Sequence, residues 1–181
     1  MIRHADPAAD AAACAAIYGF YVAETVASFD EVPLGQEEMR ERIERTSATH
    51  PWLVAEDPQG RIVGYAYGSQ HRERASYRWA CDVAVYVDHD QRGRGVGHAL
   101  YAALLPLLRE QRFHVACAGI TLPNDASVRL HESFGFTPVG IYPEIGWKAG
   151  AWHDVGWWQL QLSTDDTDQA APPEPLAPPR R

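Results

Sequence analysis

The sequence has few cysteines and no long apolar run. Its three cysteines, Cys14, Cys81 and Cys117, lie far apart and never form a C-x-x-C pair. This spacing argues against a disulfide framework and against a zinc site. No stretch approaches the roughly 20 consecutive apolar residues of a membrane span, and the opening MIRHADPAAD lacks the apolar centre of a signal peptide. We therefore expect buried thiols, no metal site, no membrane partner and a cytoplasmic protein.

Positive charge is also scarce. The chain has 16 Lys and Arg against 24 Asp and Glu, which gives a formal net charge of -8 at pH 7. Nucleic-acid binding needs a broad face of clustered Lys and Arg, so we expect no nucleic-acid partner. An anion must instead be bound locally. The one candidate is the run from Gln91 to Gly97, Q-R-G-R-G-V-G, which combines two Arg with three glycines.

The length of 181 residues suits a single domain with one active site. Hydrophobic periodicity and turn signals predict strands and helices that alternate around one sheet. The expected strands cover 52–55, 62–67, 79–87, 114–121, 137–145 and 154–162, and the expected helices cover 14–26, 36–45, the segment after the glycine run, and 125–134. The domain is expected over 1–162. The acidic and proline-rich remainder, 163–181, is predicted to be a disordered tail.

The most informative segment is the strand that ends at Val85-Tyr86-Val87 and leads through the glycine run into an amphipathic helix. Glycines allow a close backbone approach to an anion, and the first amides of a helix have no intrahelical acceptor. The P-loop pattern is absent, and His98 stands where a dinucleotide-binding loop has its last glycine. The segment therefore predicts a pyrophosphate site, with a loop that only turns the chain as the structural alternative.

Four segments of the sequence resemble motifs of a known enzyme family. The run after Val85-Tyr86-Val87 resembles the acetyl-CoA pyrophosphate motif of the GNAT acetyltransferases. The segments P-W-L-V-A-E from Pro51, L-P-N-D from Leu122 with the following S-V-R-L-H-E, and W-H-D-V-G from Trp152 resemble the phosphinothricin acetyltransferase subgroup, which includes methionine sulfoximine acetyltransferases. This similarity spans about residues 1–162.

The resemblance implies a fold, an activity and an assembly. The fold is α/β (α+β), the GNAT fold, with a central mixed, mostly antiparallel twisted sheet flanked by helices. The activity is N-acetyl transfer from acetyl-CoA to the primary amine of a small amino acid-like substrate. A homodimer is expected by analogy with the subgroup, in keeping with the aromatic density around Trp147, Trp152, Trp157 and Trp158.

The resemblance also implies where the cofactor lies. Backbone groups of the Val85-Tyr86-Val87 strand would pair with the pantetheine arm. Asn124 would bond the pantetheine side, although it could equally cap the helix that begins at Asp125, and Ser133 would touch the far end of the cofactor. The pyrophosphate would be held by the loop and the first helical turn, which comprise Arg92, Gly93, Arg94, Gly95, Val96, Gly97 and His98.

Asp82 is the candidate general base, because an amine must lose a proton before it attacks. A carboxylate inside an apolar strand is costly unless it has partners or a function. The subgroup carries a glutamate at this position, so Asp82 is shorter by about 1.5 Å and would act through an ordered water or on an amine that sits deeper. The alternative is a structural Asp bonded to a backbone amide or to an arginine such as Arg78.

His131 is the second catalytic candidate. Asn124, Ser127 and His131 share one helical face because they are three and four residues apart. The resemblance implies that His131 protonates the departing thiolate, or acts as a second base. The alternative is a helix histidine bonded to backbone or water. No acyl-enzyme is indicated, because Cys81 and Cys117 lack a sequence cue for a His partner. No metal is indicated either, because His131-Glu132 is not followed by the second His of H-E-x-x-H.

By resemblance, the substrate pocket is lined by the first helices and by the segment before the Asp82 strand. Arg78 would hold a substrate carboxylate or phosphinate, or lie on the surface. Two other functions stay open, which are acetylation of protein N-termini or lysines and a non-catalytic acyl-CoA sensor. The substrate-binding candidates are Tyr21, Thr25, Phe29, Tyr77 and Arg78.

Overall fold

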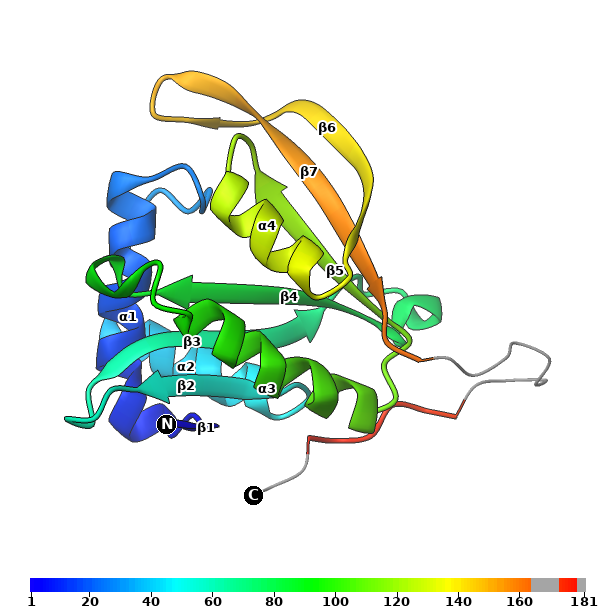
Figure 1. Cartoon of the computed structure of the whole chain (residues 1–181), viewed down its shortest axis with the longest axis horizontal. Helices are drawn as coiled ribbons and strands as arrows, with labels where there is room; N and C mark the ends of the chain where they lie inside the picture. The colour runs from blue at the N-terminus through cyan, green and yellow to red at the C-terminus, as the bar shows by residue number, and fades with distance from the viewer. Residues whose placement is uncertain (164–172, 179–181) are drawn as a thin grey trace.

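A seven-stranded sheet runs through the molecule between two layers of helices (Figure 1). The computed structural model describes residues 1–163 and 173–178. The strand order is β1-β2-β3-β4-β5-β7-β6, and all neighbours are antiparallel except β4 and β5. The predicted mixed, mostly antiparallel architecture is therefore confirmed. The strands are β1 (Ile2–His4), β2 (Trp52–Glu56), β3 (Ile62–Gln70), β4 (Ala80–Val87), β5 (Val115–Thr121), β6 (Thr137–Lys148) and β7 (Ala151–Gln161).

The four α-helices of the described residues cover opposite faces of the sheet. Figure 1 shows α3 (Val96–Glu110) and α4 (Asp125–Ser133) in front of it, with α1 (Pro7–Glu24) and α2 (Gln36–Ser47) behind. Two short 3-10 helices, η1 (Ala75–Tyr77) and η2 (His89–Gln91), flank β4. In the described part of the chain, no helix is long and apolar enough to cross a membrane.

Each face of the sheet has its own core. Leu100, Leu104 and Leu108 of α3 are fully buried, as their four-residue spacing predicts. On the other face, the rings of Trp52 and Tyr67 stack 4.2 Å apart beneath α1 and α2. Burial of side chains of this size contributes about 1.5–3 kcal/mol each, which makes the sheet a rigid support for a site at its centre.

The sheet opens between its two parallel strands. β4 and β5 pair at three positions, Ala80 with Val115, Cys81 with Ala116, and Asp82 with Cys117. Beyond that last rung, β4 continues to Val87 and β5 continues to Thr121, but the two strands no longer pair with each other. Figure 1 shows them diverging. The two strands therefore form a wedge whose closed end is the Asp82 rung.

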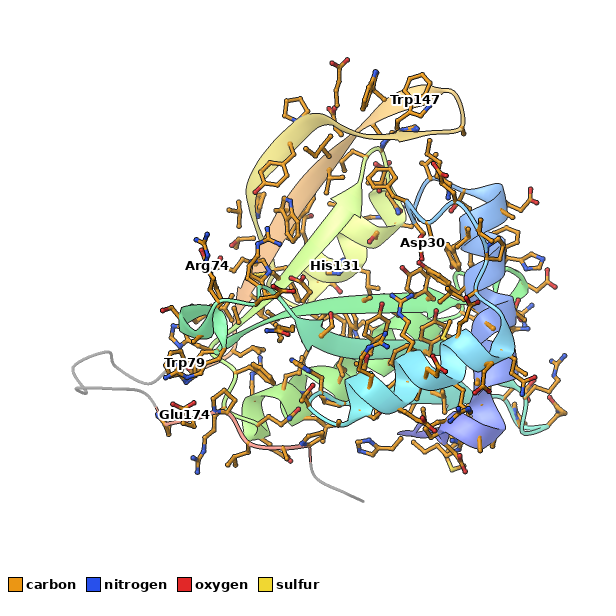
Figure 2. All side chains as sticks on the ribbon, turned by 180° about the vertical axis from the view of Figure 1, so that it is seen from behind. Asp30, Arg74, Trp79, His131, Trp147 and Glu174 are labelled. Atoms are coloured by element: carbon orange, nitrogen blue, oxygen red, sulfur yellow. The ribbon has the colours of Figure 1, made fainter. Side chains whose placement is uncertain are left out.

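Part of the C-terminal segment lies against the body. Composition predicts disorder over 163–181. Individual contacts between this segment and the folded domain cannot be predicted from composition. Residues 164–172 and 179–181 lie outside the described residues. Figure 2 shows Glu174 beside Trp79. Three contacts hold residues 173–178, namely Glu174 with Arg78, the carbonyl of Pro173 with the Trp79 indole, and Leu176 with Gln111.

Candidate active site

The open wedge is a cleft of about 650 Å³. One wall is the free edge of β4 from Val83 to Val87, and the other is the end of β5 from Gly119 to Thr121. The glycine loop with the start of α3, the first two turns of α4 and the end of α1 complete the lining. A groove of this kind offers unpaired strand backbone along its length and a helix N-terminus at one end.

The glycine loop has the conformation that its sequence requires. Gly93 and Gly95 have φ of 72° and 80°, values that strain any residue with a side chain, and Gly95 is the N-cap of α3. The first amides of α3, at Val96, Gly97 and His98, have no intrahelical acceptor. All three residues line the cleft together with Gly95. A Cβ on Gly97 would lie 3.3 Å from Cδ2 of Leu130, so this glycine allows α3 and α4 to pack closely.

Other charged and polar groups of the predicted cofactor site lie around the loop. The guanidinium of Arg92 stacks over the rings of Phe20 and Tyr21, at 5.0 and 5.2 Å from their centres. His98 packs against Phe134 and also lines the cleft. Arg94 is exposed and lies outside the cleft lining.

The free edge of β4 is already bound by one side chain. The Tyr21 hydroxyl donates to the carbonyl of Val87 at 2.7 Å and lies 3.4 Å from the Val87 amide. Tyr86 points toward α1, where its ring meets those of Tyr18 and Tyr21 edge to face. Val85 packs instead with the α3 core. The backbone from Val83 to Val85 is therefore the part of this edge that a strand-like ligand meets without a competing side chain.

Asn124 and Ser133 differ in their surroundings. Asn124 lines the cleft, and its side-chain oxygen accepts from the Ser127 amide at 3.1 Å, so it caps α4. This bond uses one carbonyl oxygen and leaves the amide nitrogen as a donor. Ser133 is exposed, donates to the carbonyl of Leu130 and lies outside the cleft lining.

His131 lies in the cleft wall with both ring nitrogens bonded. Nδ1 is 2.7 Å from the carbonyl oxygen of Ser127, so this nitrogen carries a hydrogen and donates. Nε2 is 2.9 Å from the Tyr101 hydroxyl. The side chain is 3% exposed, and burial lowers the pKa of His131. The ring is therefore neutral near pH 7, and its Nε2 accepts from Tyr101.

Asp82 lies at the closed end of the wedge, one residue before the cleft lining begins at Val83, and on the opposite face of the sheet from His131. Side chains alternate along β4, so Asp82 shares the α1 face with Tyr86, whereas Val83 and Val85 face α3. Burial raises the pKa of Asp82, while a hydrogen bond to His71 and the nearby charge of Arg72 lower it. The contact joins Oδ1 of Asp82 to Nδ1 of His71 at 2.6 Å.

His71 is one of the site residues that sequence reasoning missed, and Arg72 beside it is another. His71 stands in Q-H-R-E-R after β3, in a segment without a recognisable motif. Its partner Asp82 and the thiol of Cys117 complete a trio whose donor atoms lie within 4.8 Å of one another. Burial raises the pKa of Cys117 to about 11, so this cysteine carries its proton near pH 7. The absence of a metal site stays a prediction.

The predicted substrate residues fall into two groups. Thr25 lines the cleft beside Tyr21, and its hydroxyl ends α1 by donating to the Tyr21 carbonyl. Phe29 lies farther out, in the loop between α1 and α2. It packs against the β6–β7 hairpin so closely that a Cβ on Gly146 would overlap its ring.

Lys148 joins that loop to the hairpin. It is the only lysine in the sequence. Its Nζ donates to the carbonyls of Val22, Ser28 and Asp30 at 2.7, 2.6 and 3.0 Å. Figure 1 shows the hairpin reaching over toward this loop. One ammonium group therefore fixes the hairpin over the α1 side of the wedge.

Tyr77 and Arg78 lie beyond His71. The Tyr77 ring meets the His71 ring edge to face at 5.9 Å. Arg78 forms two bonds with Glu174, at 2.7 and 2.8 Å, and stacks over Trp79. A second cation, Arg72, lies close enough to influence the pKa values of both Asp82 and Cys117.

These features fit acetyl-CoA. The strand edge offers backbone partners to an amide-containing arm, and the glycine loop offers amides to a pyrophosphate. The sequence from residue 2 to residue 157 matches the acetyltransferase (GNAT) domain family. The chain belongs to the GNAT acetyltransferases. It is therefore an enzyme that transfers an acetyl group from acetyl-CoA, its co-substrate, to an amine.

Individual relatives of this GNAT chain agree with the family assignment. The phosphinothricin N-acetyltransferase of Streptomyces viridochromogenes is 40% identical over 171 residues, 94% of this chain and 90% of the relative. The L-methionine sulfoximine/L-methionine sulfone acetyltransferase of Pseudomonas aeruginosa is 36% identical over 165 residues, 91% of this chain and 94% of the relative. A solved acetyltransferase from Salmonella typhimurium, with acetyl-CoA as its cofactor, has a TM-score of 0.88 and 36% identity and covers 96% of this chain and 97% of that one.

Proposed function

We propose that this acetyltransferase acts on the primary amine of a small amino acid-like compound of the phosphinothricin or methionine sulfoximine type. The observation that carries the proposal is Asp82 at the closed end of the wedge, on the face of the sheet opposite the glycine loop and α3. An amine that enters from the α1 face reaches a carboxylate beside the point where the two strands part. The two relatives named for these substrates support this choice of compound.

Asp82 is the proton acceptor in this proposal. Acetyl-CoA supplies the acetyl group as a thioester, the activated carbon that an amine attacks. Amines are mostly protonated at pH 7, so the carboxylate of Asp82 takes the ammonium proton and frees the nitrogen lone pair. The strand edge and the amides of α3 hold the cofactor, with Asn124 and Arg92 at its sides. His131, neutral and bonded to Tyr101, supports the cleft wall on the cofactor side.

The anionic group of the substrate needs a cation on the α1 face. Arg78 is one candidate, and it is already paired with Glu174. Arg72 is the other, because its charge acts on Asp82 and Cys117. We propose Arg72 as the first contact of a substrate carboxylate, with Tyr21, Thr25, Tyr77 and Phe29 bounding the pocket.

The test is a panel of acceptors with thiol release as the readout. The panel holds phosphinothricin, methionine sulfoximine, methionine sulfone, ordinary amino acids and a peptide with a free N-terminal alanine. We expect turnover on the first three to exceed turnover on the peptide by tenfold or more in kcat/KM, about 1.4 kcal/mol. Preferred turnover of the peptide would support a protein acetyltransferase instead. Binding of acetyl-CoA without turnover of any amine would support a non-catalytic sensor.

We also propose a homodimer. The four tryptophans of the prediction have different surroundings. Trp147 and Trp152 in the β6–β7 hairpin are 55% and 58% exposed, Trp158 is buried and Trp157 is half-buried. Figure 2 shows Trp147 near the tip of the hairpin. An exposed apolar surface of this kind is typical of an interface. Its other exposed members are Val139, Ile141, Tyr142 and Ile145.

Light scattering at micromolar concentration tests the assembly. We expect a dimeric mass for the native chain and a monomeric mass for Trp152→Glu. Val32→Glu, at an exposed residue outside the hairpin, serves as the control and should stay dimeric. A monomeric native chain would refute the interface. The cytoplasmic location stays a prediction.

A further inference from the structure

The contact between His71 and Asp82 combines two segments that no sequence motif connects. Asp82 lies opposite Ser69 in the β3–β4 ladder, and His71 follows two residues after Ser69, just beyond the end of β3. The pairing of Ser69 with Asp82 therefore brings the His71 imidazole close to the Asp82 carboxylate. At 2.6 Å, Nδ1 of His71 donates to Oδ1 of Asp82, which fixes the tautomer of the ring.

Aromatic rings hold His71 in place. Its ring meets Tyr77 of η1 at 5.9 Å and Trp157 of β7 at 6.0 Å, both edge to face. The side chains of His71 and Asp82 are 15% and 30% exposed, so the imidazole is the more shielded partner. Two walls from distant parts of the chain thus restrict the ring to the orientation in which it reaches Asp82.

We propose that His71 is the positioning residue for Asp82, and that it holds the carboxylate ionised and oriented toward the incoming amine. The inference rests on the proposed function, in which Asp82 is the proton acceptor. An aspartate replaces the subgroup's glutamate here and reaches about 1.5 Å less far. A carboxylate on so short a side chain gains from a fixed partner, because a donor on one oxygen orients the other.

The charges around the pair support this role. Burial raises the pKa of Asp82, and His71 is the largest of the influences that lower it, followed by Arg72. Tyr77 and Cys117 are titratable groups beside the pair, and Cys81 precedes Asp82 in β4. Both thiols are neutral near pH 7 because burial raises their pKa. His71 therefore counters the burial that would otherwise protonate Asp82 before an amine arrives.

The proton balance of the step is simple. The ammonium N–H bond breaks, its proton goes to the Asp82 carboxylate, and the nitrogen lone pair forms the new C–N bond. The C–S bond of the thioester breaks, and its electron pair leaves with sulfur. The nitrogen loses a second proton as the amide forms, and this proton reaches the departing thiolate through solvent, which gives the free thiol. The carboxyl returns its proton to solvent before the next turnover. His71 keeps its Nδ1 hydrogen throughout and touches the reaction only through Asp82.

Two substitutions at one position separate this role from a packing role. His71→Phe keeps a ring between Tyr77 and Trp157 but removes the donor. His71→Asn keeps a donor near the Nδ1 position but removes the ring. His114→Phe is a matched control, because Nδ1 of His114 lies at the same 2.6 Å from a partner, the Ser163 hydroxyl, and neither residue belongs to the proposed site.

The first readout is kcat/KM against pH from about 5.5 to 9. Removal of the donor raises the pKa of Asp82, so the carboxylate form appears only at higher pH. We expect the acidic limb of His71→Phe to move up by about one unit or more and kcat at pH 7 to fall about tenfold or more, with acetyl-CoA KM unchanged. His71→Asn should restore most of the loss, and His114→Phe should match the native profile.

The second readout needs no substrate. The carboxyl carbon of Asp82, followed by ¹³C NMR, reports its pKa in the native chain and in each variant. We expect a higher pKa in His71→Phe than in the native chain and in His71→Asn. This result, together with no turnover of any amine, would keep the positioning role and reject the proposed function. An unchanged Asp82 titration and acidic limb in folded His71→Phe would overturn the positioning role. Equal losses in the Phe and Asn variants would also overturn it, because a donor at this position would then not be enough to restore activity.

Discussion

The two faces of the wedge differ in the groups that they offer to a ligand, which are mainly backbone groups on one face and side chains on the other. On the α3 face, the cofactor side consists mainly of backbone, with a free strand edge, two glycines at positive φ and the first amides of a helix. On the α1 face, the amine side consists of side chains from β4, β5, β7 and the segment after β3, with Asp82 and His71 at the centre. A site made of backbone groups is encoded by one short stretch of consecutive residues. A site made of side chains depends on segments that come together only in the folded protein.

The strongest test of this contrast is Asp82→Asn, which keeps the size of the side chain and removes the base. We expect kcat to fall by about 10² or more while acetyl-CoA affinity stays unchanged. The loss should shrink as pH rises, because more of the amine then arrives neutral and needs no base. Asp82→Glu should retain substantial activity. Steady-state rates from about pH 6 to 9 measure both effects. Native-like turnover of Asp82→Asn at pH 6 would make Asp82 a structural residue.

The backbone side is tested by Gly95→Ala with Gly60→Ala as its matched control. Both glycines have φ of 80°, and a Cβ on either one meets no atom within 4 Å. The strain of a left-handed Ala, roughly 1–2 kcal/mol, should therefore lower the melting temperature of both variants alike. Only Gly95 lines the cleft. We expect its variant alone to bind acetyl-CoA about tenfold more weakly by calorimetry, about 1.4 kcal/mol. Equal affinities would remove the loop from the cofactor site.

Lys148→Met tests how far the amine-binding side of the wedge depends on the hydrogen bonds of one lysine. Removal of the ammonium leaves the carbonyls of Val22, Ser28 and Asp30 without their donor, at a cost of about 1–3 kcal/mol in the free energy of unfolding. The KM of the amine should rise several-fold, and that of acetyl-CoA should not. Arg40→Met, which removes exposed ion pairs with Glu37 and Glu44, is the control and should cost less in urea denaturation. Equal losses would make the Lys148 contacts ordinary surface contacts.

The smallest expected effect belongs to Tyr101→Phe, on the cofactor side. The variant removes the hydroxyl that donates to Nε2 of His131. We expect a loss of about 1 kcal/mol in unfolding free energy and no movement of the acidic limb of kcat/KM, because the lowered pKa of His131 keeps the ring neutral in any case. A shift of that limb, read in the same pH series, would show that His131 takes part in proton transfer.

The sequence by itself determined what is local and periodic. Leucines four residues apart predict the buried face of α3, and the glycine run predicts an anion site at the start of that helix, because each property belongs to neighbouring residues. Alternation along β4 also separated Asp82 from Val83 and Val85. The sequence is compatible with both a cap and a cofactor contact for Asn124, and the structure shows that it caps α4 while it lines the cleft.

The tertiary structure alone decided which distant residues meet. His71 reaches Asp82 only because β3 and β4 pair in one register, and the wedge opens because β4 and β5 stop pairing after Asp82. Arg78 pairs with Glu174, 96 residues away, and Lys148 binds carbonyls more than 100 residues before it. Such contacts leave no local pattern, because a carboxylate or an ammonium can find its partner anywhere along the chain. Strand register and loop packing select that partner, and both are properties of the whole sheet.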